Sequence, residues 1–171
     1  MQWIESFCDT FAKYLGVIIS FLLILMMVNV AFDTLNRYLM NSNSVALQEM
    51  EWHLFSVIIL LGTSYALSEE GHVRVDIFYT NFSAKKKAII NMIGVITFVL
   101  PLSLLVAFGS LGFVEEAYIF MEQSGDPGGL PFRFIIKGLI PTSFFILIFM
   151  SVGYFARNYN LLKRLNSGSK S

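Results

Sequence analysis

The sequence predicts an all-α integral membrane protein with four transmembrane helices and both termini in the cytoplasm. Three observations predict this fold. Of the 171 residues, 56% are hydrophobic and only 14% are charged, whereas a soluble domain carries about 25% charged residues. The mean hydropathy is +0.66. The apolar residues also form runs of membrane-spanning length, and lysine and arginine concentrate in the segments that four crossings would place on one side.

The first apolar run is long enough to cross a bilayer. A crossing of about 30 Å of hydrocarbon needs roughly 20 helical residues, because each residue advances the helix by about 1.5 Å. Residues 14–32 carry no charge and meet this length. We expect the helix to continue beyond this run, which gives a span over about 14–37. The helix should stop in the turn-prone Asn-Ser-Asn-Ser of residues 41–44.

The second run is less clear from hydropathy alone. The apolar run over 54–67, free of charge and histidine, has only 14 residues, which is short for a crossing. Extending the run toward the N-terminus adds Glu49, Glu51 and His53. These side chains would have to lie near an interface or against another protein helix, since a carboxylate facing lipid is costly. We predict a second span over about 47–67.

The third and fourth runs both fit a crossing. Residues 88–114 are 27 uncharged residues, which allows tilt, and Pro101 gives a reason for a kink. The fourth span is predicted over about 134–156, with Pro141 inside it as a second place for a bend.

The connections complete a single four-helix domain over residues 1–171. We expect a cytoplasmic linker over 68–87, whose apolar alternation suits either a short strand-like stretch or an amphipathic surface piece. We expect a periplasmic turn over 121–133, which contains Asp-Pro-Gly-Gly-Leu-Pro. The small polar residues 166–171 predict a disordered tail.

Basic residues predict the orientation. With four spans, the N-terminus, the middle linker and the C-terminus share one side and hold nine lysines and arginines, which are Lys13, Arg74, Lys85, Lys86, Lys87, Arg157, Lys163, Arg164 and Lys170. The first and third loops hold three, which are Arg37, Arg133 and Lys137. Basic residues are retained in the cytoplasm, so both termini are expected there. The lysines at 85, 86 and 87 are interpreted as an anchor at anionic lipid.

Asn29, Asp33 and Arg37 are spaced four apart and therefore share one face of the first helix. Three interpretations are open. Asp33 and Arg37 form a local ion pair that makes a charged helix end tolerable, or the face docks on a neighbouring helix or subunit, or these groups serve an ion pathway directly.

Glu49 and His53 are likewise four apart, with Glu51 between them and Trp52 placed for an interfacial aromatic belt. This patch is either a set of structural contacts near the interface or an ion-coupling site. Secondary transporters usually have two related halves and broken helices near the midplane, and this sequence has neither. Asn29, Asp33, Arg37, Glu49, Trp52 and His53 are therefore candidates for contact with a partner.

A haem site fits the sequence poorly. His53 and His72 are 19 residues apart, so along a continuous helix they lie roughly 28 Å apart and cannot ligate one iron. The single cysteine, Cys8, gives no disulfide and no metal-ligand spacing. The sequence predicts no catalytic, substrate-binding or metal-ligating residue, no cofactor and no nucleic-acid partner.

Two regions resemble a known family. The first has three short stretches, which are Ala-Leu-Gln-Glu-Met-Glu-Trp-His-Leu-Phe at 46–55, Leu-Gly at 61–62 and Glu-Gly-His-Val-Arg-Val-Asp at 70–76. The second has Asp-Pro-Gly-Gly-Leu-Pro-Phe-Arg at 126–133, Ile-Lys at 136–137 and Ile-Pro at 140–141. Together they resemble the small membrane subunit (Q, or DctQ-like) of TRAP (tripartite ATP-independent periplasmic) transporters, over about residues 14–155. Phe134 departs from the tryptophan expected after the arginine.

The resemblance implies a non-enzymatic scaffold subunit in a bacterial or archaeal inner membrane. In this family a periplasmic binding protein captures an organic anion, usually a carboxylate, and a large elevator-type subunit imports it by sodium symport. The small subunit is expected to bind and brace the large one, within membrane lipid, and to help form the docking surface. Asp126 and Arg133, in the outer loop, are the docking candidates.

Two alternatives stay open from the residues alone. One is a membrane anchor of a redox enzyme that binds haem or quinone, and the other is a small homo-oligomeric channel. In the TRAP family the substrate specificity lies in the binding protein, which is another chain. This sequence therefore does not identify the substrate.

Overall fold

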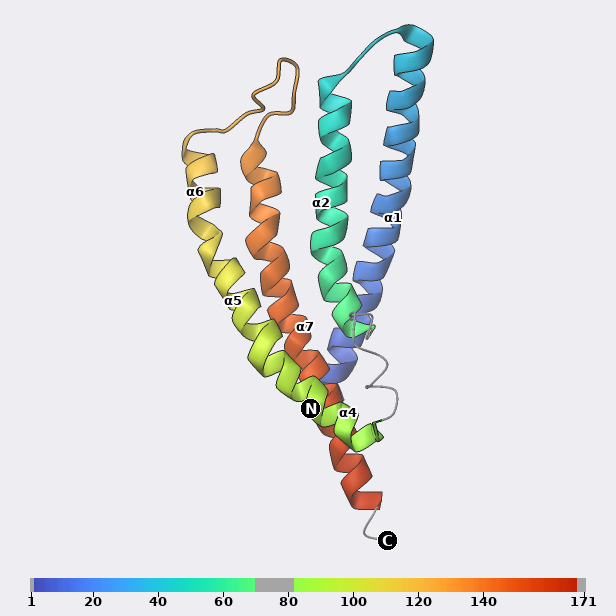
Figure 1. The fold of residues 1–171 in the computed structure, drawn as a ribbon, viewed down its shortest axis with the longest axis vertical. Helices are drawn as coiled ribbons and strands as arrows, with labels where there is room; N and C mark the ends of the chain where they lie inside the picture. Colours follow the sequence, from blue (N-terminus) through green and yellow to red (C-terminus); the bar gives the residue numbers. More distant parts are fainter. Residues whose placement is uncertain (1, 70–81, 169–171) are drawn as a thin grey trace.

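The computed structural model describes residues 2–69 and 82–168, and these form helices without any strand. The helices, in chain order, are α1 (Gln2–Met40), α2 (Val45–Ser68), α4 (Ala84–Gly94), the π-helical turn η1 (Val95–Val99), α5 (Leu100–Gly109), α6 (Leu111–Ile119) and α7 (Arg133–Gly168). The segments α4 to α6 form one continuous rod (Figure 1). Within the described part of the chain, four rods are long and apolar enough to cross a membrane, which confirms the predicted all-α, four-span class.

The four rods run up and down, so the chain has two distinct ends (Figure 1). The connections 41–44 and 120–132 lie together at one end, called the loop end below. The start of α1, the end of α2, the start of α4 and the end of α7 lie toward the other, called the terminal end. Helix α7 contacts all the other rods, while α1 packs mainly on α2.

The first and last helices are longer than a bilayer is thick. Helix α1 has 39 residues and α7 has 36, so each extends for roughly 55 Å at about 1.5 Å per residue. The hydrocarbon core is only about 30 Å thick. These helices therefore tilt in the membrane or project beyond its hydrocarbon.

The third rod changes its winding just before Pro101. Residues Val95–Val99 form a π-helical turn, and the Leu100 N–H donates to the Val95 carbonyl, five residues back. A proline lacks the N–H for its own helical bond, and its ring crowds the carbonyl four residues before it. Widening the preceding turn accommodates this proline, and Figure 1 shows that the rod bends along its length. A second interruption at Ser110 separates α5 from α6.

The buried core lies toward the terminal end, where α1, α2, η1 and α7 meet. Its buried members are Cys8, Ala12, Leu67, Val95, Leu147, Met150 and Tyr154. Small residues allow the close helix approach that stabilises membrane bundles. A Cβ on Gly153 would overlap the Cys8 side chain, and one on Gly16 would lie 2.9 Å from the Tyr65 ring.

Polar contacts also join the rods at the terminal end. The Arg157 guanidinium pairs with Asp9 of α1 and donates to the Ser68 carbonyl of α2 at 3.0 Å. The Asn160 amide donates to Glu5 at 2.8 Å. One side chain of α7 thus fixes the start of α1 and the end of α2.

The structure corrects one predicted boundary. Residues 166–168 are helical, although the tail was predicted to be disordered from residue 166. Extending an existing helix is far easier than starting one, so small polar residues continue α7. Helix α4 begins at Ala84, within the predicted linker, with the Ser83 hydroxyl accepting from the Lys86 N–H. The alternation at Val73, Val75 and Ile77 lies outside the described residues.

Candidate functional site

The buried carboxylate of Glu49 fastens the α6–α7 loop to the first turns of α2. Its Oε1 accepts from the Ser124 hydroxyl at 2.5 Å, and its Oε2 accepts from the Leu130 backbone N–H at 2.5 Å. The Arg133 guanidinium lies 3.5 Å from Oε1. Glu49 is only 5% exposed, so the loop shields it from its surroundings. A carboxylate so enclosed is stable only with such partners.

The loop has the backbone turns that this contact requires. The Gly129 N–H donates to the Asp126 carbonyl, and Gly128 adopts a φ of +84°, which only glycine takes without strain. A Cβ on Gly129 would overlap Ser124 and lie 2.8 Å from Glu49 Oε2. The Gly-Gly pair therefore serves both the turn and the close approach of the loop to the carboxylate.

A second carboxylate extends the contact toward α7. Glu122 pairs with Lys137, and Arg133 lies 4.0 Å from it. The backbone N–H of Arg133 also donates a hydrogen bond to the backbone carbonyl of Glu122 at 3.0 Å. We call Glu49, Glu122, Ser124, Arg133 and Lys137 the loop-end network. It contains two carboxylates and two cations, so its formal charge balances.

Two aromatic rings lie against the cations of this network. The Arg133 guanidinium carbon lies 5.6 Å from the centroid of Trp52, and Lys137 Nζ lies 3.8 Å from the centroid of Phe113. Both distances fall within the range of cation–π attraction. The rings come from α2 and α6 and the cations from α7, so these contacts join three rods.

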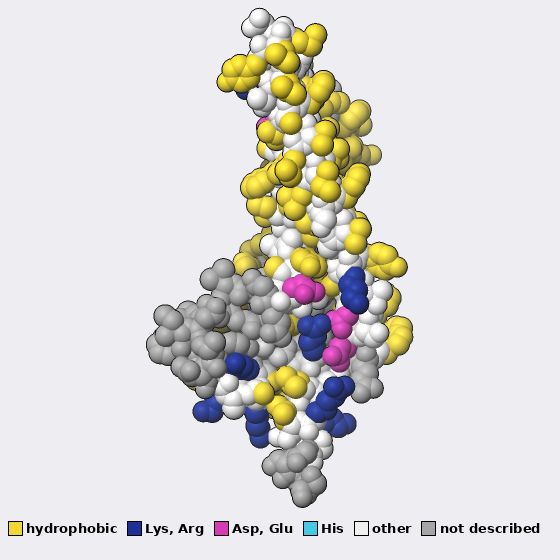
Figure 2. All heavy atoms as spheres, turned by 90° about the vertical axis from the view of Figure 1, so that its right-hand side faces the viewer, with side chains coloured by type: hydrophobic (Ala, Val, Ile, Leu, Met, Phe, Trp, Pro, Cys, Tyr) yellow, Lys and Arg dark blue, Asp and Glu magenta, His cyan; other side chains and the backbone are white. Residues whose placement is uncertain are grey.

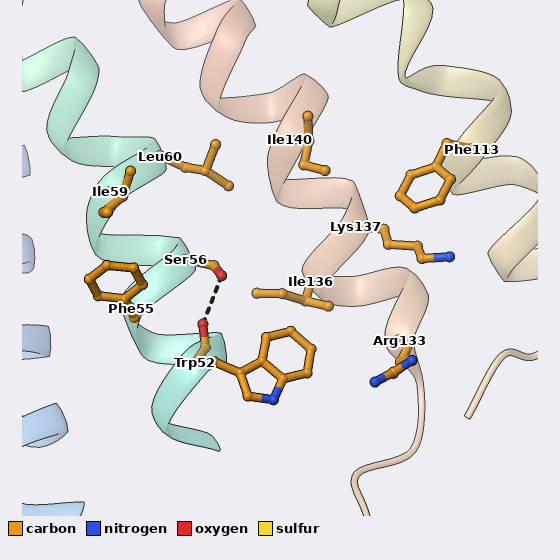
Figure 3. Close-up of a pocket in the computed structure, with 10 residues that line it drawn as sticks. All are labelled: Trp52, Phe55, Ser56, Ile59, Leu60, Phe113, Arg133, Ile136, Lys137 and Ile140. Carbon is orange, nitrogen blue, oxygen red and sulfur yellow. Dashed lines mark hydrogen bonds between the residues drawn. The ribbon is translucent and has the colours of Figure 1, made fainter. Parts of the chain in front are cut away.

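A cavity of about 470 Å³ lies beside the network, among α2, α6 and α7. Figure 3 shows Arg133 pointing from α7 toward the Trp52 indole, with apolar side chains deeper along both helices. The lining residues are Trp52, Phe55, Ser56, Ile59, Leu60, Phe113, Arg133, Ile136, Lys137 and Ile140. The site combines a charged rim with apolar walls.

Three of the predicted candidates meet here, and others lie elsewhere. Glu49, Trp52 and Arg133 belong to or border the loop-end network. His53 lies beside it, with Nδ1 2.6 Å from the Glu49 carbonyl oxygen and its ring 3.9 Å from that of Trp52. Asp126 is exposed at the loop surface, and its backbone shapes the turn.

The predicted face of α1 is turned toward α2. The Asn29 amide donates to the Leu47 carbonyl at 3.0 Å, and the fully buried Asp33 pairs with Arg37. The ion pair that the spacing predicted is therefore present. The anchor lysines at 85, 86 and 87 lie in the first turn of α4, at the terminal end.

Sequence reasoning missed Glu122, Ser124, Lys137 and Phe113 as members of the site. No periodic pattern connects them, because they meet only when the loop folds back onto α2. One signal was available. An acidic residue precedes the turn-rich loop and basic residues follow it, and opposite charges attract when a turn brings them close together.

Fold and site together define a polytopic α-helical membrane protein whose buried charges at the loop end are paired within the chain. The model of the family described as tripartite ATP-independent periplasmic transporters, DctQ component, matches residues 26–161, and the chain belongs to this family. The match covers most of the chain and confirms the resemblance seen in the sequence. No curated protein matches the chain.

Membership places the chain in a known kind of assembly. A DctQ component is part of a transporter rather than an enzyme, and it implies a large DctM-type membrane subunit and a periplasmic binding protein as partners. With four membrane-spanning helices, this fits a multi-pass protein of the inner membrane.

Proposed function

We propose that this chain is the scaffold subunit of a sodium-coupled TRAP transporter that imports an organic anion of the carboxylate type. It binds and braces the large elevator subunit and helps form the surface on which the periplasmic binding protein docks. The observation that carries this proposal is the α6–α7 loop, which Glu49 holds in one shape at the loop end. A rigid outer loop is suited to docking, because little ordering is lost on binding.

The proposed orientation puts the loop end in the periplasm and both termini in the cytoplasm. The three predicted cytoplasmic segments carry nine of the twelve lysines and arginines, and the described parts of these segments lie toward the terminal end (Figure 1). Figure 2 shows blue side chains gathered at the lower end and mostly hydrophobic side chains above them. This distribution supports the orientation through retention of basic residues in the cytoplasm.

The proposed division of labour follows from exposure. Four candidates are buried or half-buried and contact other groups of this chain, so we assign them to holding its shape; they are Asn29, Asp33, Glu49 and His53. Arg37 is 47% exposed and Trp52 41% exposed, so these two are the proposed contacts for the large subunit.

The same criterion separates the two docking candidates. Asp126 is exposed on the loop and is assigned to the binding protein. Arg133 is assigned mainly to the shape of the loop, through Glu49. If Asp126→Asn and Arg133→Gln together left uptake unchanged, this assignment would be wrong.

Copurification tests the proposal as a whole. The tagged chain is extracted from its native membranes in mild detergent, and its companions are identified by mass spectrometry. A stoichiometric large polytopic subunit supports the scaffold function. Recovery with a haem or flavin subunit would indicate a redox anchor instead, and a homo-oligomer without a large partner would indicate a channel.

A further inference from the structure

We infer that the cavity among α2, α6 and α7 is a binding site for one glycerophospholipid, with its phosphate at Arg133 and Lys137 and an acyl chain along the apolar walls. This inference does not depend on the proposed transport function. It requires only that the loop end lies at a membrane–water interface, as Trp52 beside the charged rim indicates.

The Arg133 guanidinium is the first reason. It carries five N–H donors, yet its nearest carboxylate oxygens lie 3.5 and 4.0 Å away, beyond ordinary hydrogen-bond length. Its Nε is buried and lacks a hydrogen-bond partner within the described residues. A buried donor without an acceptor is costly. A phosphate offers the paired oxygens that a guanidinium binds best.

The carboxylates of the network do not supply that acceptor. Glu49 already accepts from Ser124 and Leu130, one bond at each oxygen. Glu122 pairs with Lys137. Lys137 has three donors and uses one of them on Glu122. Among the described residues both cations therefore have donors left over, and they lie on one rim of the same cavity.

The length of the cavity suits an acyl chain. Its α2 wall runs from Trp52 to Leu60 and its α7 wall from Arg133 to Ile140, which correspond to roughly 10–12 Å along each helix. One leaflet contributes about 15 Å of hydrocarbon. The cavity thus extends from the charged rim through most of one leaflet, with Phe55, Ile59 and Ile140 among its walls.

A partner helix fits less well than a lipid. An apolar helix would bring no anion to the unused donors of Arg133 and Lys137. An unbranched chain with a charged head matches the change from polar rim to apolar wall along the cavity.

Native mass spectrometry of the full chain, delipidated and titrated with dioleoyl-phosphatidylglycerol, tests the site. We expect one tightly held lipid, and Arg133→Met with Lys137→Met should weaken its binding by at least about tenfold. Lys163→Met with Arg164→Met, exposed at the terminal end, is the matched control and should keep the tight site. Equal binding by the rim variant and the wild type would overturn the proposal, as would displacement of the lipid by inorganic phosphate alone.

A second measurement leaves the network intact. A photo-crosslinking residue replaces Phe55, a half-exposed wall residue, and the chain is irradiated within its native complex. A covalent phospholipid adduct is expected, and Leu60→Trp, which fills the cavity, should abolish it. Crosslinking to the large subunit, with no lipid adduct, would show that a protein side chain occupies the cavity and would contradict the lipid site.

Discussion

The Glu49 carboxylate accepts a hydrogen bond of 2.5 Å from the Leu130 N–H, although 81 positions separate the two residues. This contact joins the start of α2 to the loop before α7, at the end of the molecule that we assign to the periplasm. Because Glu49 also holds Ser124, a single side chain closes the loop at two points. The account of the docking surface depends on this arrangement.

Removing the charge of Glu49 should loosen the loop. Glu49→Gln keeps the size of the side chain but loses two charge-assisted bonds, each worth about 1.5–3 kcal/mol. We expect faster hydrogen exchange at the Leu130 amide and faster proteolysis within residues 121–132. Glu51→Gln, two positions along the same helix, is the control and should behave as wild type. Unchanged exchange in the Glu49 variant would show that the loop keeps its shape without this carboxylate.

A methyl group at Gly129 should disturb the same contact sterically. Its Cβ would overlap Ser124 and lie 2.8 Å from Glu49 Oε2, so Gly129→Ala forces the loop away at a cost of about 1–3 kcal/mol. Gly125→Ala is the matched control, since nothing lies within 4 Å of its Cβ among the described residues. Thermal unfolding in detergent compares the two. Equal midpoints would contradict the close approach.

The packing of α1 on α7 should be equally sensitive to an added methyl group at a close contact. Gly153→Ala introduces a Cβ that overlaps Cys8, so the midpoint of thermal unfolding should fall. Cys8→Gly in the same chain removes the obstructing side chain and should restore part of the loss. Gly62→Ala serves as the control, because no atom of the described residues lies within 4 Å of the added Cβ. A double variant no more stable than Gly153→Ala alone would argue against direct contact.

Cysteine labelling tests the orientation. Cys8 is the only cysteine of the chain, so Cys8→Ala provides an unreactive background. With Asp126→Cys, a membrane-impermeant maleimide should label cells whose outer membrane is open but whose inner membrane is intact. With Ser167→Cys, labelling should require disruption of the inner membrane. The reverse pattern would place the termini in the periplasm.

The first, third and fourth spans were predictable because hydropathy is a local property. A run such as 88–114 reports its own length and polarity, and Pro101 marks the place where the helix must adjust. The Asp33–Arg37 pair was predictable for the same reason, since residues four apart on a helix are neighbours.

The loop-end network was not predictable in this way. Ser124 and Leu130 reach Glu49 only through the packing of α2 beside α7, and no periodicity reports that approach. The sequence indicated that Glu49 would be costly if it faced lipid and would need a protein partner. It did not indicate that its hydrogen-bond donors lie in the α6–α7 loop of the same chain. The tail prediction failed over 166–168 because composition says little about a helix that continues from a long one.

The most direct test of the central claim is uptake by reconstituted transporter. The large subunit is placed in liposomes with its binding protein and a labelled organic anion, with and without this chain, under a sodium gradient. Our account predicts rapid sodium-dependent uptake only when the chain is present, and a marked loss with Glu49→Gln. Equal uptake by the large subunit alone would contradict the scaffold function.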